Sequence, residues 1–293
     1  MISIDNARVV KGLLFAVCSF TWGQGLYYYS NLPTLKEPAP DSYDAAFVTA
    51  AHRRFMETVR FPRLVANHFK TWEVVHPFNG GSNLSSIRWW GSSFNTMPNG
   101  QDYTIKEYEY SEFGHIFFQL TQWHRDNVLV EIDGESHSVP MNILLGGPGN
   151  EAWPERFTRW LKLQNLTWDQ WLVQYIDENI ARVKKFLMEF EDNGVKSTLI
   201  LWPEVYNHGA VLGDEYISRI DNDPWLSERL LRLTYEGNTY NSMEALMNAH
   251  SEMTIKKDVA SFKDTPKDHH PSLKMHSVMA DNIIDHLTKL GFE

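Results

Sequence analysis

Residues 12–23 read GLLFAVCSFTWG, and this stretch decides how the rest of the chain is interpreted. Its first six residues, 12–17, are continuously apolar, which is typical of a central strand that is buried on both faces. Ser19 follows directly after this predicted strand. In an open parallel sheet, ligands bind outside the carboxyl ends of the strands. Ser19 is therefore a candidate site residue, and its alternative role is to cap a following helix.

The same stretch imitates a targeting signal. Arg8 and Lys11 precede the apolar run, but the run is only about half as long as a membrane-spanning helix requires, and no small-residue cleavage site follows it. A lipoprotein signal needs a small residue where Val17 precedes Cys18, and Asp5 interrupts the basic region. We therefore expect a buried first strand and a cytoplasmic protein.

The apolar periodicity of the remaining chain predicts strands that alternate with helices. Short extended runs predict further strands at 72–76, 116–120, 128–132 and 197–202. Helical spacing predicts mostly helical segments at 45–69, 167–192 and 277–290. Within the first of these segments, Pro62 marks a helix start. The alternation implies a three-layer α/β/α fold around a central, mostly parallel sheet.

The spacing of these elements bears on domain organisation. We expect a single domain over residues 1–293, with long loop insertions at about 90–113 and 133–166. Loops of this length inside a compact domain usually carry function or cover a site.

Composition narrows the class of protein. Apolar residues make up 43% of the chain and charged residues 22%, the balance of an ordinary globular protein. The net charge of −10, without a basic stripe, argues against a nucleic-acid partner. The single cysteine permits no internal disulfide. The 11 tryptophans exceed ordinary usage, and such a surplus often lines sites for sugars or other flat ligands.

Two further segments carry residue types that suit catalysis. The turn NGGSN at 79–83 follows the second predicted strand, and its glycines allow a backbone N–H to approach a ligand closely. Near the end, residues 267–272 read KDHHPS, with Asp268 two residues before His270. A carboxylate at that spacing suits an imidazole that acts as general base for a serine. Each segment alone is also compatible with an ordinary solvated turn.

The adjacent histidines His269 and His270, together with His276, raise the alternative of a metal site. A zinc site normally needs three or four ligands, and the sequence shows no second cluster with ligand spacing. We therefore expect neither a metal nor another cofactor.

Taken together, the three segments resemble the SGNH (GDSL-like) hydrolase family, and the resemblance extends over nearly the whole chain. It implies a flavodoxin-like sheet topology and a serine esterase. By resemblance, Ser19 is the nucleophile, His270 is the base and Asp268 orients the base. His276 matches a position that is structural in this family.

The resemblance also implies an oxyanion hole. Its donors would be the N–H of Ser19, a backbone N–H of Gly80 or Gly81, and the side chain at the end of the third strand. The family has an asparagine at that last position, and here Thr121 falls nearest to it. The alternatives are that the neighbouring Gln122 donates this hydrogen bond or that the third donor is missing.

The family's Gly-Asp before the serine is replaced by Val17-Cys18. That aspartate is not a triad member, so its loss leaves the proposed chemistry in place. Cys18 is a rival nucleophile, but we expect its side chain to point back toward the sheet.

The chemistry implied is acyl transfer through an acyl-enzyme. The polar loops, together with the chemistry that is common in the family that the chain resembles, favour a small-molecule or polysaccharide ester, with an O-acetylated carbohydrate as the leading substrate. Candidate substrate contacts are Trp22, Asn83 and Trp123. Trp89, Trp90, Trp153 and Trp160 also fall in or beside the long loops, where rings can stack on sugars or simply pack. A binding protein that has lost efficient catalysis and an O-acyltransferase are the alternatives.

Overall fold

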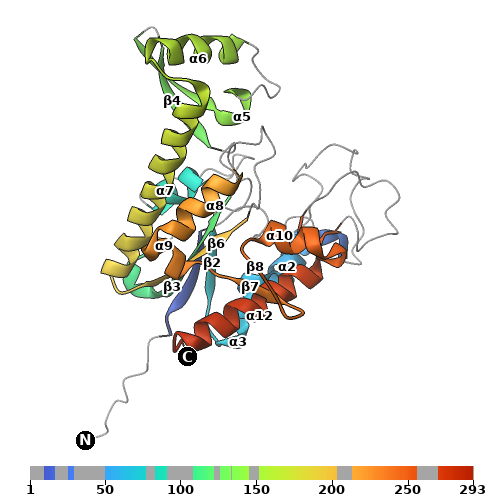
Figure 1. The fold of residues 1–293 in the computed structure, drawn as a ribbon. Helices are drawn as coiled ribbons and strands as arrows, with labels where there is room; N and C mark the ends of the chain where they lie inside the picture. Colours follow the sequence, from blue (N-terminus) through green and yellow to red (C-terminus); the bar gives the residue numbers. More distant parts are fainter. Residues whose placement is uncertain are drawn as a thin grey trace, which may run out of the picture.

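The computed structural model describes residues 10–16, 26–29, 50–76, 83–90, 108–121, 126–132, 134–144, 152–202, 213–255 and 270–292. Figure 1 shows the arrangement of the elements. The strands are β1 (Gly12–Ala16), β2 (Glu73–His76), β3 (Phe113–Leu120), β4 (Asn127–Ile132), β5 (Glu135–Pro140), β6 (Lys196–Leu201), β7 (Leu233–Tyr235) and β8 (Asn238–Tyr240). The α-helices are α2 (Ala50–Val59), α3 (Phe61–His68), α4 (Asn83–Trp90), α5 (Met141–Leu144), α6 (Ala152–Leu163), α7 (Trp168–Asp192), α8 (Gly213–Asn222), α9 (Pro224–Arg229), α10 (Met243–Ala249) and α12 (Leu273–Lys289). The 3-10 helices are η1 (Leu26–Tyr29), η3 (Tyr110–Glu112) and η5 (Ser251–Met253).

The central sheet has four parallel strands in the order β2-β1-β3-β6. This is the strand order of flavodoxin-like, doubly wound sheets up to their fourth strand. Beyond β6, Leu230 forms a parallel bridge with Leu199, so the chain after α9 briefly continues the sheet at this edge. The observed sheet confirms the predicted fold class, a parallel sheet between layers of helices.

Alternate residues of the strands face opposite helical layers. Leu14 and Ala16 of β1 belong to the apolar cluster that includes the buried face of α7. Leu13 and Phe15 belong to the other cluster, with α3, α10 and α12. In Figure 1 the helices α7, α8 and α9 accordingly lie on one side of the sheet, and α2, α3, α10 and α12 lie on the other. Because both faces are covered, β1 is buried at all five positions, as its unbroken apolar run predicts.

The long helix α7 follows the sequence prediction closely. Thr167 caps its N-terminus by accepting a hydrogen bond from the Gln170 N–H at 3.2 Å, and the Gln170 side chain accepts one from the Thr167 N–H at 2.9 Å. This capping box provides partners for N–H groups that a helix start would otherwise leave unpaired. At the other end the chain leaves the helix at Asn193 and continues through Gly194, whose φ of 79° suits glycine.

Two elements, β3 and α12, begin several residues earlier than predicted, whereas the starts of the other predicted strands differ by less. β3 starts at Phe113 rather than at 116, because the polar His115 that interrupts the apolar pattern is fully buried beside Thr198 of β6. α12 starts at Leu273 rather than at 277, because Ser272 caps it and accepts a hydrogen bond from the Met275 N–H at 3.2 Å. In both cases a tertiary or capping contact extends the element beyond its apolar periodicity.

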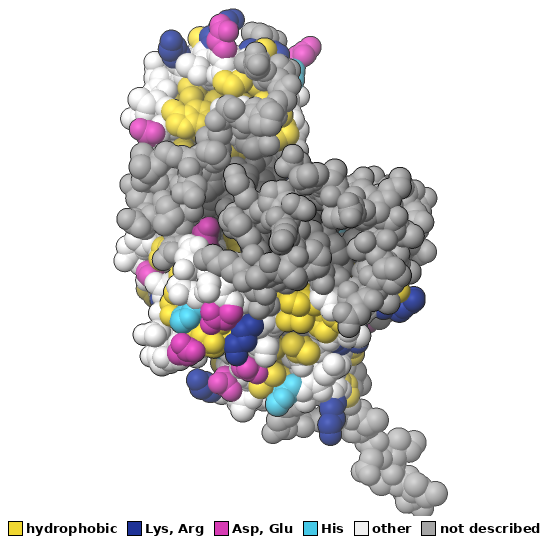
Figure 2. All heavy atoms as spheres, turned by 90° about the vertical axis from the view of Figure 1, so that its right-hand side faces the viewer, with side chains coloured by type: hydrophobic (Ala, Val, Ile, Leu, Met, Phe, Trp, Pro, Cys, Tyr) yellow, Lys and Arg dark blue, Asp and Glu magenta, His cyan; other side chains and the backbone are white. Residues whose placement is uncertain are grey.

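The stretch 133–166 differs from the expected loop insertion. β4 and β5 form an antiparallel hairpin outside the central sheet, and α5 and α6 pack with it. This unit projects beyond the N-terminal end of α7, at the top of Figure 1. Hydrophobic side chains are visible on it in Figure 2, and Leu129 and Leu163 are 72% and 76% exposed. β5 escaped prediction because it has only one buried residue, Val139, and therefore no apolar alternation.

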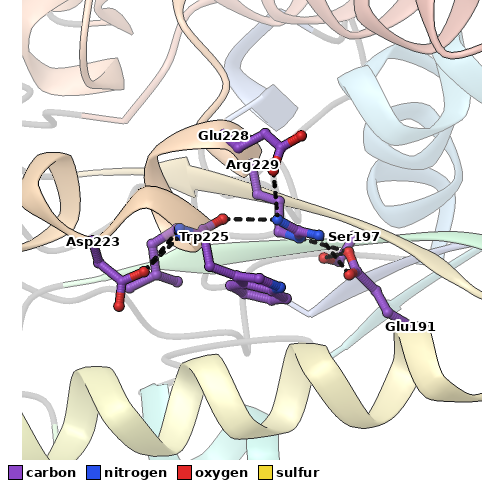
Figure 3. A network of polar contacts seen from close by, with 7 residues as sticks. Glu191, Ser197, Asp223, Trp225, Glu228 and Arg229 are labelled. Atoms are coloured by element: carbon purple, nitrogen blue, oxygen red, sulfur yellow. Dashed lines mark hydrogen bonds and ion pairs between the residues drawn. The ribbon is translucent and has the colours of Figure 1, made fainter.

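A polar network ties α9 to α7 and to the start of β6 (Figure 3). Arg229 donates two hydrogen bonds of 2.7 Å to the two carboxylate oxygens of Glu191. Glu191 also accepts a hydrogen bond of 2.6 Å from the Ser197 hydroxyl. The Arg229 guanidinium lies 3.8 Å from the ring centroid of Trp225.

In the described part of the chain, no helix is both long enough and apolar enough to cross a membrane.

Candidate active site

Three neighbouring strands end at one edge of the sheet, where the predicted site residues follow them in sequence. Ala16, the last residue of β1, is level with His76 of β2 and with Phe118 of β3. From β1 the chain passes to β2 on one side and then to β3 on the other side, so the winding reverses between β1 and β3. Ligands of doubly wound sheets bind outside such a reversal point. The fold therefore places the candidate site beyond the carboxyl ends of β1 and β3.

The structure describes three of the predicted site residues, namely Thr121, Asn83 and His270. The others lie outside the described residues: Ser19, Trp22, Gly80, Gly81, Trp123 and Asp268, together with the rival candidates Cys18 and His269. Their assignments stay predictions.

Thr121 and Asn83 lie together in a buried polar cluster. The Thr121 N–H donates to Asn83 Oδ1 at 2.8 Å, and Asn83 Nδ2 donates to the Thr121 carbonyl at 3.1 Å. Both residues are 1% exposed. The Thr121 Oγ1 is buried and has no hydrogen-bond partner among the described residues. Thr121 thus presents a hydroxyl at the end of β3 while both of its own backbone groups are occupied.

Asp126 completes this cluster, and sequence reasoning missed it. Its Oδ1 accepts the Leu84 N–H at 2.9 Å, and its Oδ2 lies 3.4 Å from Asn83 Nδ2. The residue is 0% exposed, just before β4. Only its place shortly after the end of a buried strand could have indicated it, because the partners of Asp126 come from the start of α4, which is distant in sequence.

His270 lies in a short, well-bonded segment that leads into α12. It is 7% exposed, and its carbonyl accepts the Ile255 N–H at 3.0 Å. Its neighbour Pro271 pairs with Thr254 in an antiparallel bridge. These contacts fix the backbone of His270 just before the Ser272 cap.

The direction of α12 places His270 at the same edge as Thr121. The end of this helix lies near the amino ends of the strands, because Lys196 at the start of β6 donates to the Leu290 carbonyl at 2.7 Å. A helix of 17 residues spans about 25 Å, which carries its first turn to the opposite edge. His270 therefore lies on the side of the molecule where the strands end.

His276, in the first turns of α12, is a buried and neutral histidine. Its Nδ1 accepts the Phe61 N–H at 3.2 Å, which joins α12 to the start of α3. Burial, and secondarily the nearby Arg60 and His270, lower its pKa to about 3. The described residues contain no group of three or more side chains that could hold a metal ion.

His76 is a second buried histidine at this edge that sequence reasoning did not single out. It closes β2, is 5% exposed and has its pKa lowered to about 3 by burial. Its ring is therefore neutral at physiological pH.

The tryptophans expected in loops pack against the apolar core where they are described. Trp90 ends α4 with its ring centroid 4.6 Å from that of Phe190. Trp153 and Trp160 lie on α6, partly buried, and not in a loop.

No family model matches the chain, and no curated protein matches it. One solved structure is similar, a psychrotrophic esterase, EstA from Pseudoalteromonas sp., in a form inhibited by monoethylphosphonate. The two chains are 9% identical, the TM-score is 0.47, and the match covers 97% of this chain and 100% of the esterase.

Proposed function

We propose that the protein is a serine esterase in which Ser19 is the nucleophile, His270 the general base and Asp268 the residue that orients the base. The observation that carries the proposal is the buried Thr121 hydroxyl at the end of β3, which has no partner among the described residues. β1 and β3 are adjacent and parallel, with Ala16 level with Phe118. Ser19 and Thr121 each follow that level by three residues in sequence.

The reaction begins when His270 takes the proton of the Ser19 hydroxyl and the serine oxygen attacks the ester carbonyl. The oxyanion that forms is held by the N–H of Ser19, a backbone N–H of Gly80 or Gly81 and the Thr121 hydroxyl. The intermediate expels the alcohol, which takes the proton from His270. Water then attacks the acyl-enzyme by the same route and releases the acid.

The burial of His270 and its fixed backbone support its role as the base. A general base must be held near the nucleophile, and the hydrogen bond to the His270 carbonyl and the bridge at Pro271 hold the backbone of His270 in place. His276 and His76 are less suited, because burial lowers the pKa of each to about 3 and so weakens it as a base at neutral pH.

For the substrate we propose an O-acetyl ester on a carbohydrate. The motif resemblance and the tryptophans Trp22 and Trp123, close in sequence to Ser19 and Thr121, support this choice. An acyltransferase would pass the same acyl group to a sugar hydroxyl instead of to water, and product analysis with a sugar acceptor present separates the two.

The test is hydrolysis of p-nitrophenyl acetate and of acetylated xylo-oligosaccharides by the wild type and three variants. Ser19→Ala and His270→Ala should lower kcat by at least about 10³-fold, because residues of a triad act as a unit. His269→Ala is the matched control for His270→Ala and should keep most of the rate. If Ser19→Ala retains its activity, the nucleophile is wrong, and if His269→Ala is the inactive variant, the base is wrong.

A further inference from the structure

We propose that Asp126 and Asn83 form a buried clamp that positions the Thr121 hydroxyl as an oxyanion-hole donor. The inference rests on the proposed esterase function and adds two positioning residues to it. Neither is proposed to touch the substrate, so Asn83, which is 1% exposed, takes a positioning role in place of the substrate contact that the sequence suggested.

Asn83 holds the backbone of Thr121 through two hydrogen bonds. One amide side chain bonds the N–H of Thr121 at 2.8 Å and its carbonyl at 3.1 Å. These two hydrogen bonds fix the peptide planes on both sides of the Thr121 Cα, and with them the direction of its Cα–Cβ bond. They also occupy the Thr121 N–H, so that the side-chain hydroxyl is the donor that this residue can offer to a substrate.

Asp126 sets the orientation of the Asn83 side-chain amide. An asparagine side chain can be turned by 180°, which exchanges its donor and acceptor ends. A carboxylate accepts hydrogen bonds and donates none, so Asp126 Oδ2, at 3.4 Å, favours the Nδ2 end. This orientation leaves Asn83 Oδ1 facing the Thr121 N–H. The acceptor oxygen of Asp126 therefore favours the flip state of Asn83 in which both hydrogen bonds to Thr121 form.

The buried side chain of Asp126 is stabilised by its contacts at the start of α4. Asp126 is 0% exposed, and its Oδ1 accepts the Leu84 N–H in the first turn of α4. The start of a helix favours negative charge, and a hydrogen bond from a backbone N–H favours the ionised carboxyl. The same contact ties α4 to the start of β4, and the bonds between Asn83 and Thr121 tie α4 to the end of β3, so the clamp is part of the framework of the site.

The Thr121 hydroxyl is held in place together with its backbone. Threonine is β-branched, so its side chain has few rotamers once the backbone is fixed. A donor that is held in place before the reaction, and is paired only when charge develops on the substrate oxygen, stabilises the transition state more than the ground state. The clamp supplies that fixed placement.

The experiment is a double-mutant cycle on esterase kcat with Thr121→Val, Asp126→Asn and the double variant. Thr121→Val keeps the shape of the side chain and should lower kcat by about 10²–10³-fold with little change in KM. Thr121→Ser restores the hydroxyl and should recover most of the rate. Asp126→Asn should lower kcat by about tenfold or more, because an amide no longer selects one flip state of Asn83.

The cycle distinguishes positioning from general structural damage. If Asp126 acts through Thr121, the double variant should be no slower than Thr121→Val alone. Losses that multiply, or an Asp126→Asn enzyme with wild-type kcat, would overturn the clamp. If Asp126→Asn lacks a cooperative thermal transition, Asn83→Ser takes its place in the cycle, since serine also suits a helix start but lacks the amide.

Different results would contradict the clamp and the proposed esterase function. A wild type that hydrolyses esters through Ser19, with Thr121→Val equally fast, overturns the clamp alone. A folded wild type without Ser19-dependent hydrolysis overturns the proposed function and the clamp together.

Discussion

Arg229 shows how much a single side chain contributes to joining elements of this protein. It donates both hydrogen bonds to Glu191 at 2.7 Å, donates a third to the Trp225 carbonyl at 2.9 Å and lies over the Trp225 ring (Figure 3). Burial alone would raise the pKa of Glu191, but the bonds from Arg229 and Ser197 outweigh it and the net pKa is lowered. The pair is therefore ionised at neutral pH and geometrically well matched.

Replacing Arg229 by methionine should lower the free energy of unfolding by about 1–3 kcal/mol, because Glu191 loses charge-assisted hydrogen bonds. Urea unfolding at pH 7.5 measures this. The matched control is Glu228→Gln, which removes a carboxylate that also contacts Arg229 but is 79% exposed. We expect this control to stay within about 0.5 kcal/mol of the wild type. Equal losses in the two variants would contradict the account.

At the residue scale, the sequence predicts groups that follow strands, but it does not reveal groups that meet through space. Thr121 and His270 were predicted from their places after β3 and before α12, and both prove to be buried at one edge of the sheet. Asp126 was missed because its partners Asn83 and Leu84 stand more than 40 residues earlier in the chain. Such a contact leaves no local pattern.

At the scale of elements, the hydroxyl of Thr198 joins two strands and a helix. It lies 2.7 Å from Nε2 of His115 on β3 and 2.9 Å from Nε2 of His286 on α12. A hydroxyl can donate to one ring and accept from the other, so one residue serves two partners.

Thr198→Val keeps the shape of the side chain and removes both bonds. It should lower the free energy of unfolding by about 1–3 kcal/mol, because the fully buried His115 ring loses its partner. Thr198→Ser keeps the hydroxyl and should cost only about 0.8 kcal/mol, the value of one buried methyl group. Thermal or urea unfolding compares the two, and a serine variant as unstable as the valine variant would contradict this interpretation.

Elements with strong local signals were predictable, and the others were not. β1 has an unbroken apolar run, and α7 has both helical periodicity and a capping box. β5 has one buried residue and exists because it pairs with β4, so its signal lies in another strand. α6 is amphipathic but was obscured by the expectation that a Trp-rich stretch is a loop.

At the scale of the molecule, four buried or partly buried histidines among the described residues make stability depend on pH. Burial lowers the pKa of each of them below the ordinary 6.5; they are His76, His115, His276 and His286. Below about pH 6.5 the unfolded chain therefore binds more protons than the folded chain. Their contribution to stability is complete above that pH and is lost as the pH falls toward the lowered values.

The free energy of unfolding should fall by about 1 kcal/mol for each strongly buried histidine between about pH 6.5 and 5.5. His115→Gln removes one of these groups and should reduce the fall by about 1 kcal/mol, whatever it does to the stability at pH 7.5. Urea unfolding across this range measures both slopes. A flat profile in the wild type would show that these histidines stay neutral in the unfolded chain or become protonated in the folded one.

The fold of the whole molecule was predictable because alternate apolar residues of a few strands cover the two faces of the central sheet. Leu13 and Phe15 pack on one layer, and Leu14 and Ala16 on the other. That arrangement requires helices on both faces of the sheet. The projecting unit of β4, β5, α5 and α6 was not predictable in the same way, because it adds to the fold without changing the strand order of the sheet.

The central claim is that Ser19 is an activated nucleophile, and labelling with a fluorophosphonate probe tests it most directly. Wild type, Ser19→Ala and His270→Ala are treated in parallel, and the modified peptide is identified by mass spectrometry. We expect one adduct on Ser19, which is absent from Ser19→Ala and forms much more slowly in His270→Ala. A folded wild type that forms no adduct, or forms it on another residue, would contradict the account.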